Sequence, residues 1–234
     1  MSKLKGDIID VTDLTAEQKD RIFQLMSVYY SGVNAETFSR DLLEKQWILI
    51  LSDSSGTIQG FTTLMIISHM VSKVELRCVF SGDTIIDDRF RGELELMKVW
   101  LKFVINYDES HDGGLFWFLI SKGYRTYKLL PLFFREFYPR FDQVMPPDIK
   151  IVMDKFSLDK FPNEYDCQSG IITPDNGDYL RTGKDDISEH HLKDPHVKFF
   201  AETNPFFWKG NELVCLARLS RDNLNKFGRR LISR

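Results

Sequence analysis

Hydrophobic and polar positions in the first third of the chain alternate between strand-like and helix-like patterns. The short apolar run "DIIDV" predicts a first strand, and apolar residues then recur at the three- and four-residue spacing of a helix over residues 22–29. Thr15, with Gln18 three residues later, has the capping-box pattern that begins such a helix, and Gly32 is placed to end it. A second amphipathic helix is predicted over residues 35–45.

The middle of the chain is dominated by strand patterns. "WILIL" and "IQGFTTLMII", joined by "SDSSGT", predict a hairpin, and "VELRCVFSGDTII" predicts a strand long enough to bend or bulge near Gly82. A helix is predicted after Gly92, followed by the continuous apolar run "LFWFLI", which is typical of a fully buried strand. The next helix should begin near Ser121, kink or split at Pro131, and end by Pro139.

Residues 142–195 break this regularity. They hold twelve acidic and six basic residues, a net charge of −6, with weak apolar periodicity and many turn residues. This composition predicts an irregular acidic insertion or lid. "VKFFAET" and "ELVCLARL" then predict a closing hairpin, and residues 222–230 a short basic helix.

The order of these elements predicts one α/β (α+β) domain built around a mixed central sheet flanked by helices. Its expected parts are a core over residues 5–141, the insertion over 142–195, and a C-terminal hairpin and helix over 196–234. A chain of 234 residues is long enough to bury a large core without disulfides or a structural metal.

Charge and cysteine content narrow the class of protein. The formal charge of −3 disfavours nucleic-acid or membrane binding by bulk charge. Three cysteines without zinc or redox spacing, and no signal-like or membrane-spanning run, favour reduced thiols in a soluble cytoplasmic protein. The P-loop-like "GDYLRTGK" and the histidines at 190, 191 and 196 match no standard nucleotide or metal spacing, so no metal is expected.

The stretch "IDDRFRG" joins a predicted strand to a predicted helix. The start of a helix presents unpaired amide groups and the positive end of the helix dipole, so such junctions bind anions. Arg89 or Arg91 could add charge-assisted hydrogen bonds to phosphate oxygens.

Together with the element order over roughly residues 5–141, "IDDRFRG" resembles the acyl-CoA pyrophosphate loop of the GNAT N-acetyltransferase superfamily. That loop reads approximately V-x-P-x-x-R-G, overlapping Q/R-x-x-G-x-G/A. The donor-binding positions implied by the resemblance are Ile86, Arg89, Arg91, Gly92, Glu93 and Leu94. The sequence departs from the motif at Asp88, where proline is common, and at Leu94 and Leu96, where the family has small residues.

The resemblance implies direct transfer of an acetyl or other acyl group from acyl-CoA to an amine, without a covalent enzyme intermediate. In such enzymes the loop strand bends, here near residues 81–84, and a backbone N–H group splayed at the bend polarises the thioester carbonyl. Tyr127, with Tyr124 in reserve, would protonate the leaving thiolate, unless its role is core packing. Glu75 or a water chain would serve as the base.

Two other functions fit the same sequence features. The donor could be an acyl-carrier protein, which would reduce the demand on the pyrophosphate loop, or the domain could be a non-catalytic binding module. The acceptor, a small-molecule or peptide amine, and the oligomeric state are left open. The negative charge of residues 142–195 suggests a cationic acceptor if this segment lies near the site, and otherwise a solvated loop.

Overall fold

The computed structural model describes residues 4–71, 73–90, 92–174, 179–180 and 186–233. The strands are β1 (Lys5–Asp10), β2 (Tyr30–Ser31), β3 (Trp47–Ser52), β4 (Ile58–Val71), β5 (Val74–Ile86), β6 (Leu115–Ser121), β7 (Tyr165–Asp166), β8 (Ile171–Ile172), β9 (Tyr179–Leu180) and β10 (Glu212–Arg218). The helices are α1 (Ala16–Tyr29), α2 (Ala35–Leu43), α3 (Glu95–Ser110), α4 (Tyr124–Tyr127), α5 (Leu129–Phe133), α6 (Pro147–Lys160), α7 (Pro195–Thr203) and α8 (Lys226–Ile232).

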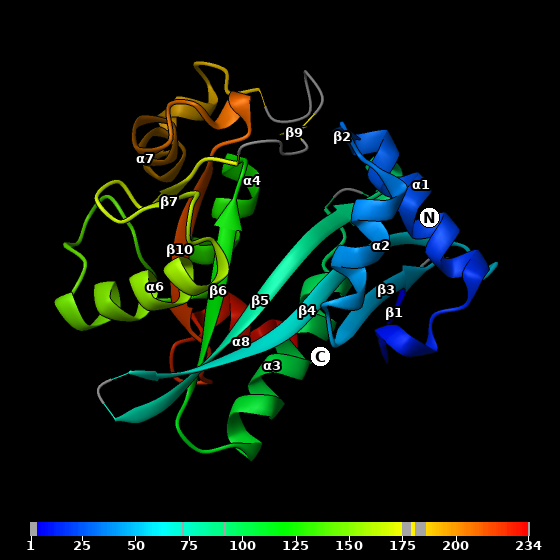
Figure 1. Cartoon of the computed structure of the whole chain (residues 1–234), viewed down its shortest axis with the longest axis horizontal. Coiled ribbons are helices and arrows are strands. Elements are labelled where there is room, and N and C mark those ends of the chain that lie inside the picture. The colour runs from blue at the N-terminus through cyan, green and yellow to red at the C-terminus, as the bar shows by residue number, and fades with distance from the viewer. Residues whose placement is uncertain (1–3, 72, 91, 175–178, 181–185, 234) are drawn as a thin grey trace.

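A single eight-stranded mixed sheet organises the fold, in the order β1-β3-β4-β5-β6-β10-β8-β7 (Figure 1). Neighbouring strands run antiparallel except β5 and β6, which are parallel. A second, two-stranded sheet pairs β2 with β9. The predicted fold class, a mixed central sheet flanked by helices, is confirmed.

Helices cover both faces of the large sheet. On one face, α3 packs against β1 and β3, and its Trp100 ring contacts the Trp117 ring of β6 within a large core cluster. On the opposite face, α1 and α2 cover the β3–β4 side, and α6 covers β6 and β10. The two groups of helices on this second face therefore lie over different halves of the sheet.

Local sequence signals account for most elements of the first half. Thr15 and Gln18 form the predicted capping box, with the Thr15 hydroxyl accepting from the Gln18 amide and the Gln18 side chain accepting from the Thr15 amide. Asn34 caps α2 by accepting from the amides of Glu36 and Thr37. Helix α1 ends at Tyr29, before Gly32, because the chain turns there into the short strand β2.

The structure corrects two predictions in the second half. Residues 142–195 are more regular than expected, because they contain the 14-residue helix α6 and add β7 and β8 to the large sheet. The predicted closing hairpin is wrong: "VKFFAET" lies in helix α7. There, Asp194 caps the helix through the His196 amide, Pro195 takes the first turn, and Val197 and Phe200 are buried on one side.

Smaller predictions have mixed outcomes. The helix after β6 is split into α4 and α5, but at Lys128 and not at Pro131, which lies inside α5, and it ends at Phe133, earlier than predicted. The closing helix is present as α8. The three cysteines are free thiols. Among the described helices, none has the length and apolar character needed to span a bilayer. Most of "GDYLRTGK" lies outside the described residues.

Candidate active-site cleft

The strands β5 and β6 separate from one another partway along their length. Their parallel pairing joins Arg77–Phe80 to Leu115–Phe118 and stops there, although β5 continues to Ile86 and β6 to Ser121. Figure 1 shows the two strands diverging as a V beyond this point. The edge of β5 that faces β6 is therefore not paired to a strand over residues 81–86 in the described part of the chain.

A bulge in β5 marks the start of this divergence. Thr62 pairs with Thr84 and Leu64 with Ser81, so two residues of β5, Gly82 among them, lie opposite the single residue Thr63. The predicted irregularity near Gly82 is confirmed. A side chain at this position would collide with its neighbours, because an added Cβ would lie 2.5 Å from the Thr63 hydroxyl oxygen.

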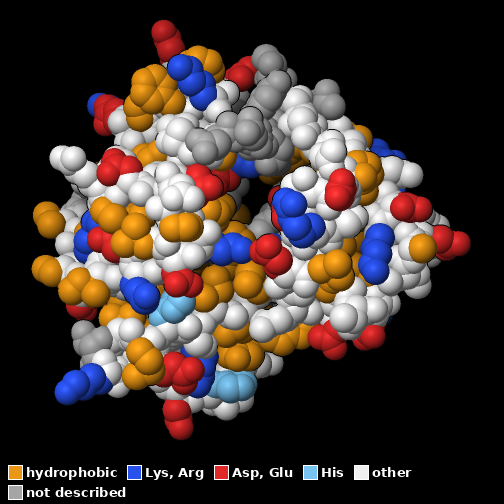
Figure 2. Space-filling view, in the orientation of Figure 1, with side chains coloured by type: hydrophobic (Ala, Val, Ile, Leu, Met, Phe, Trp, Pro, Cys, Tyr) orange, Lys and Arg blue, Asp and Glu red, His pale blue; other side chains and the backbone are white. Residues whose placement is uncertain are grey.

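The V opens on a hollow in the molecular surface. Figure 2 shows this hollow between the diverging ends of β5 and β6, with charged side chains around it and hydrophobic side chains below. An ion pair links the helices on either side, since the Lys160 ammonium at the end of α6 lies 2.8 Å from the carboxylate of Glu44 at the end of α2. The pairing of β2 with β9 makes a second link, between the α1 region and the insertion.

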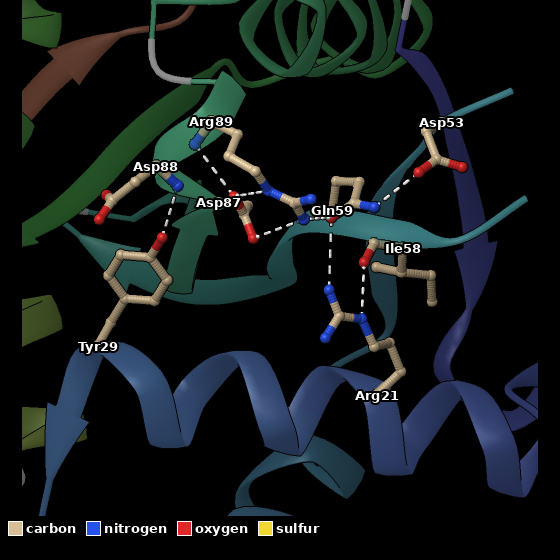
Figure 3. Close-up of polar contacts among 8 residues, drawn as sticks. All are labelled: Arg21, Tyr29, Asp53, Ile58, Gln59, Asp87, Asp88 and Arg89. Carbon is tan, nitrogen blue, oxygen red and sulfur yellow. Dashed lines mark hydrogen bonds and ion pairs between the residues drawn. The ribbon is translucent and has the colours of Figure 1, made fainter. Parts of the chain in front are cut away.

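The loop after β5 carries the predicted anion-binding motif. Most of its amides are already bonded inside the protein: Asp87 donates to the Gln59 carbonyl at 2.8 Å and Asp88 to the Tyr29 hydroxyl at 2.6 Å. The Arg89 amide donates to the Asp87 carboxylate at 3.0 Å. These bonds hold the loop against β4 and α1, as Figure 3 shows.

Arg89 is paired within this loop. Its guanidinium donates to both carboxylate oxygens of Asp87, at 2.9 and 3.2 Å, and to the side-chain oxygen of Gln59 at 3.0 Å (Figure 3). The hydrogen bond from Arg89 lowers the pKa of Asp87, so this carboxylate stays ionised at neutral pH. An incoming phosphate would therefore compete with Asp87 for Arg89.

Amides without a hydrogen-bond acceptor follow this loop, at the start of α3. Leu94 takes the N-cap position with no side-chain cap, and the Lys98 amide is the first to bond back, to the Leu94 carbonyl. The amides of the first helical turn, residues 95–97, have no intrahelical acceptor, and none is found elsewhere among the described residues. They can donate to an anion.

The predicted donor-binding positions all precede this turn, between the end of β5 and the N-cap residue of α3. Gly92 has a φ of +88°, and a Cβ there would meet nothing within 4 Å, so the space above it is open. Ile86 ends β5, and Glu93 and Leu94 are half-buried just before α3. Arg91 lies outside the described residues. Leu96, expected to crowd the turn, instead points into the core and is 1% exposed.

Tyr127 lies in the hydrophobic core. Its side chain is fully buried against Phe137, Phe199 and Phe200, and its hydroxyl donates to the Pro139 carbonyl at 3.0 Å. Burial raises the pKa of Tyr127 well above its usual range, which makes its hydroxyl a weaker acid. These contacts favour the packing role over the acid role.

Tyr124 lies at the start of α4, directly after β6, and contacts the insertion. Its hydroxyl oxygen is 3.3 Å from Nε2 of His191. The Nδ1 atom of His191 accepts from the Ser188 amide at 3.2 Å, so a neutral imidazole carries its proton on Nε2 and donates it to Tyr124. The hydroxyl proton of Tyr124 is then available to another acceptor.

Glu75 is not brought to the cleft. It lies at the opposite end of β5 from Ile86, next to the β4–β5 turn, where its half-exposed carboxylate pairs with Arg77 at 3.1 Å. Eleven strand residues at about 3.3 Å each put it roughly 36 Å along β5 from the loop. It is therefore not positioned as a base for chemistry at the V.

Four carboxylates of the insertion are paired with nearby basic side chains or a histidine. Pairs within hydrogen-bonding or ion-pair distance join Asp142 to Arg140, Asp154 to Lys150, Asp159 to His69 and Asp194 to Lys128. At the hollow itself the insertion contributes a lysine, Lys160. The described residues of the insertion thus place a basic side chain beside the Phe80 ring.

Two side chains at the cleft, Lys45 and Lys160, were not singled out in the sequence, and His191 was not connected with Tyr124. Lys45 and Lys160 both lie near the Phe80 ring, with their nitrogens 5.7 and 5.5 Å from its centre. Lys45 follows α2 and Lys160 ends α6, and these two positions are far apart in the chain, so no local pattern could have joined them. His191 belonged to a histidine cluster interpreted as a solvated loop.

No family model matches the sequence, and no curated protein does. Solved structures do resemble it. Glucosamine-6-phosphate N-acetyltransferase from Arabidopsis thaliana is 17% identical, with a TM-score of 0.38 over 62% of this chain and 97% of that one. A GNAT family N-acetyltransferase from Escherichia coli, solved with CoA, is 15% identical, with a TM-score of 0.36 over 49% of this chain and 63% of that one.

A third similar structure is a conserved Enterococcus faecalis protein described as a probable N-acyltransferase, 14% identical with a TM-score of 0.41. The match covers 53% of this chain and only 31% of that one. All three descriptions name an N-acetyltransferase or N-acyltransferase, and that of the Escherichia coli protein names the GNAT family. With TM-scores of 0.41 and below, they carry no functional conclusion, which has to come from the cleft.

Proposed function

We propose that the chain is a divergent GNAT-type acyltransferase that moves an acyl group from acyl-CoA directly to an amine. The observation that carries this proposal is that β5 separates from β6 and is followed, after a short loop, by the uncapped start of α3. The edge of β5 beyond its pairing with β6 offers backbone groups to a pantetheine arm, and the first turn of α3 offers amides to a pyrophosphate. The open space above Gly92 allows a phosphate to approach the backbone closely.

In this mechanism the bulge in β5 lies where the thioester would be held. Backbone N–H groups directed at the carbonyl oxygen would stabilise the negative charge that develops there as the amine attacks. Tyr124 is better suited than Tyr127 to protonate the leaving thiolate. The Tyr124 oxygen can accept a hydrogen bond from His191, whereas the Tyr127 hydroxyl already donates to the Pro139 carbonyl.

Binding of the donor can be tested by thermal unfolding. A ligand at a hundredfold excess over its Kd stabilises the folded state by about 2.7 kcal/mol, and for a chain of this size that is roughly 5–11 °C in Tm. Gly92→Glu should abolish the CoA shift by placing a negative side chain in the loop just before the first turn of α3. Gly56→Glu is the matched control, because Gly56 also has a positive φ, +82°, and open space around it.

Catalysis can then be tested by acyl-CoA-dependent thiol release with a panel of amines. Release that requires an amine supports transfer. A CoA shift of normal size without release from any amine favours the binding-module alternative. The absence of any shift with CoA or acetyl-CoA would contradict the proposal.

A carrier-protein donor is the second candidate, favoured by the pairing of Arg89 with Asp87. A carrier protein presents its pantetheine through a single phosphate, so it demands fewer cationic contacts than CoA does. Thiol release from an acyl-carrier protein, together with no response to CoA, would select this candidate.

A further inference from the structure

Lys45 occupies the point at which β5 and β6 part. Its Cε atom lies 3.1 Å from the position that a Cβ at Gly82 would take, so the side chain is laid directly against the bulge. Its nitrogen is 5.7 Å from the centre of the Phe80 ring, and Phe80 is the last residue of β5 paired with β6. An amine is therefore already present where the proposed thioester would be held.

Burial makes the charged form of Lys45 less favourable than that of an exposed lysine, against the opposing effect of the carboxylates of Glu44, Asp83 and Asp41 on its pKa. The residue is half-buried, and no carboxylate lies within ion-pair distance of it in the described part of the chain; its nitrogen donates to the Asp41 carbonyl at 3.0 Å. Burial, together with the like charge of Lys160, lowers the pKa of Lys45. Lys160 itself is paired with Glu44, which keeps that carboxylate engaged elsewhere.

An unpartnered hydroxyl lies at the same spot. Thr63 is 2% exposed, and its Oγ1 atom has no hydrogen-bond partner. This oxygen would lie 2.5 Å from a Cβ at Gly82, on the side of the bulge where Lys45 lies. Buried hydroxyl groups are normally hydrogen-bonded, so an unpaired one here indicates a place for an arriving polar group, such as an acyl oxygen.

We propose that Lys45 is itself an acyl acceptor, which takes the acyl group of bound acyl-CoA onto its own side-chain nitrogen. This proposal rests on the proposed function, because it needs the thioester in the cleft. The lone pair of the neutral nitrogen forms a C–N bond to the acyl carbon, the C–S bond breaks, and the departing CoA thiolate takes the proton released from the nitrogen. The products are an amide at Lys45 and free CoA.

The test is incubation of the full chain with acetyl-CoA, followed by peptide mass mapping of every lysine over time. Lys45 should be acetylated at least tenfold faster than Lys5, whose side chain is 79% exposed. Acetyl phosphate, a small donor that does not need the cleft, should reverse this preference and label Lys5 first. Lys45→Arg should abolish the fast phase, whereas Lys160→Arg, which keeps a cation beside Glu44, should retain it.

Thr63→Val tests whether labelling of Lys45 depends on the cleft or only on the reactivity of its amine. It keeps the shape of the side chain and removes the hydroxyl, so it should slow labelling of Lys45 without moving that of Lys5. Folding of each variant is checked by its Tm without ligand. If CoA raises the Tm but Lys45 is labelled no faster than Lys5, Lys45 only caps α2 and the inference is overturned while the proposed function stands. If CoA does not bind, both fail together.

Discussion

Tyr127→Phe separates a structural from a catalytic role for the tyrosine that the sequence favoured. The substitution keeps the buried ring and removes one hydrogen bond, from the hydroxyl to the Pro139 carbonyl at 3.0 Å. Pro139 is only half-buried, so water can partly replace the lost donor. The cost should therefore be about 1 kcal/mol, which corresponds to a fall of roughly 2–4 °C in Tm.

The assay pairs unfolding temperature with turnover for Tyr127→Phe and Tyr124→Phe. The Tyr127 variant should lose stability and keep its rate of amine-dependent thiol release within about threefold. The Tyr124 variant should lose roughly 10²–10⁴ in kcat if its hydroxyl protonates the thiolate. The reasoning is refuted if Tyr127→Phe keeps the wild-type Tm and loses a hundredfold or more in kcat.

Three further substitutions test separate parts of the structure. Asp87→Asn should tighten CoA binding about fivefold in a calorimetric titration, because it frees Arg89 and removes a negative charge worth about 1 kcal/mol at this kind of surface; weaker binding would contradict the role of the loop. Asp53→Asn should flatten the loss of urea resistance between about pH 4 and 2. Hydrogen bonds, first that from Ser55, hold the pKa of folded Asp53 at about 2, below its unfolded value, so its contribution is present above about pH 4 and is lost as the pH falls. Thr15→Ala should cost about 0.5–2 kcal/mol in a urea titration by removing the cap of α1, whereas Thr15→Ser should not.

Elements set by local signals could be predicted from the sequence. The cap at Thr15 and the long strand that bulges at Gly82 depend on nearby residues, and the structure reproduces both. Helix α6 was missed because its buried residues, Val152, Met153 and Phe156, form a narrow apolar face in a strongly charged segment. Helix α7 was mistaken for a strand, although Asp194 and Pro195 form a recognisable helix start.

The candidate site shows the same division between local and distant information. The junction after Ile86 was visible in the sequence, because a strand, a glycine and a helix follow one another there. The hydrogen bonds inside this junction could not be predicted, because Arg89 donates to Gln59, a residue of the preceding strand. Lys45 and Lys160 meet around Phe80 only because α2 and α6 cover different halves of one sheet face.

The pairing of β6 with β10 has a consequence for synthesis of the chain on the ribosome. The apolar strand "LFWFLIS" has β5 on one side over only four residues, and β10 on the other over most of its length. Residue 212, where β10 begins, is made long after residue 121, roughly 5–20 s later at cellular rates of elongation. During that interval one edge of a very hydrophobic strand has no partner, which is the situation in which nascent chains aggregate or recruit chaperones. Ribosome-bound chains arrested before residue 212 should therefore be far more dependent on chaperones than chains arrested after β10 has emerged.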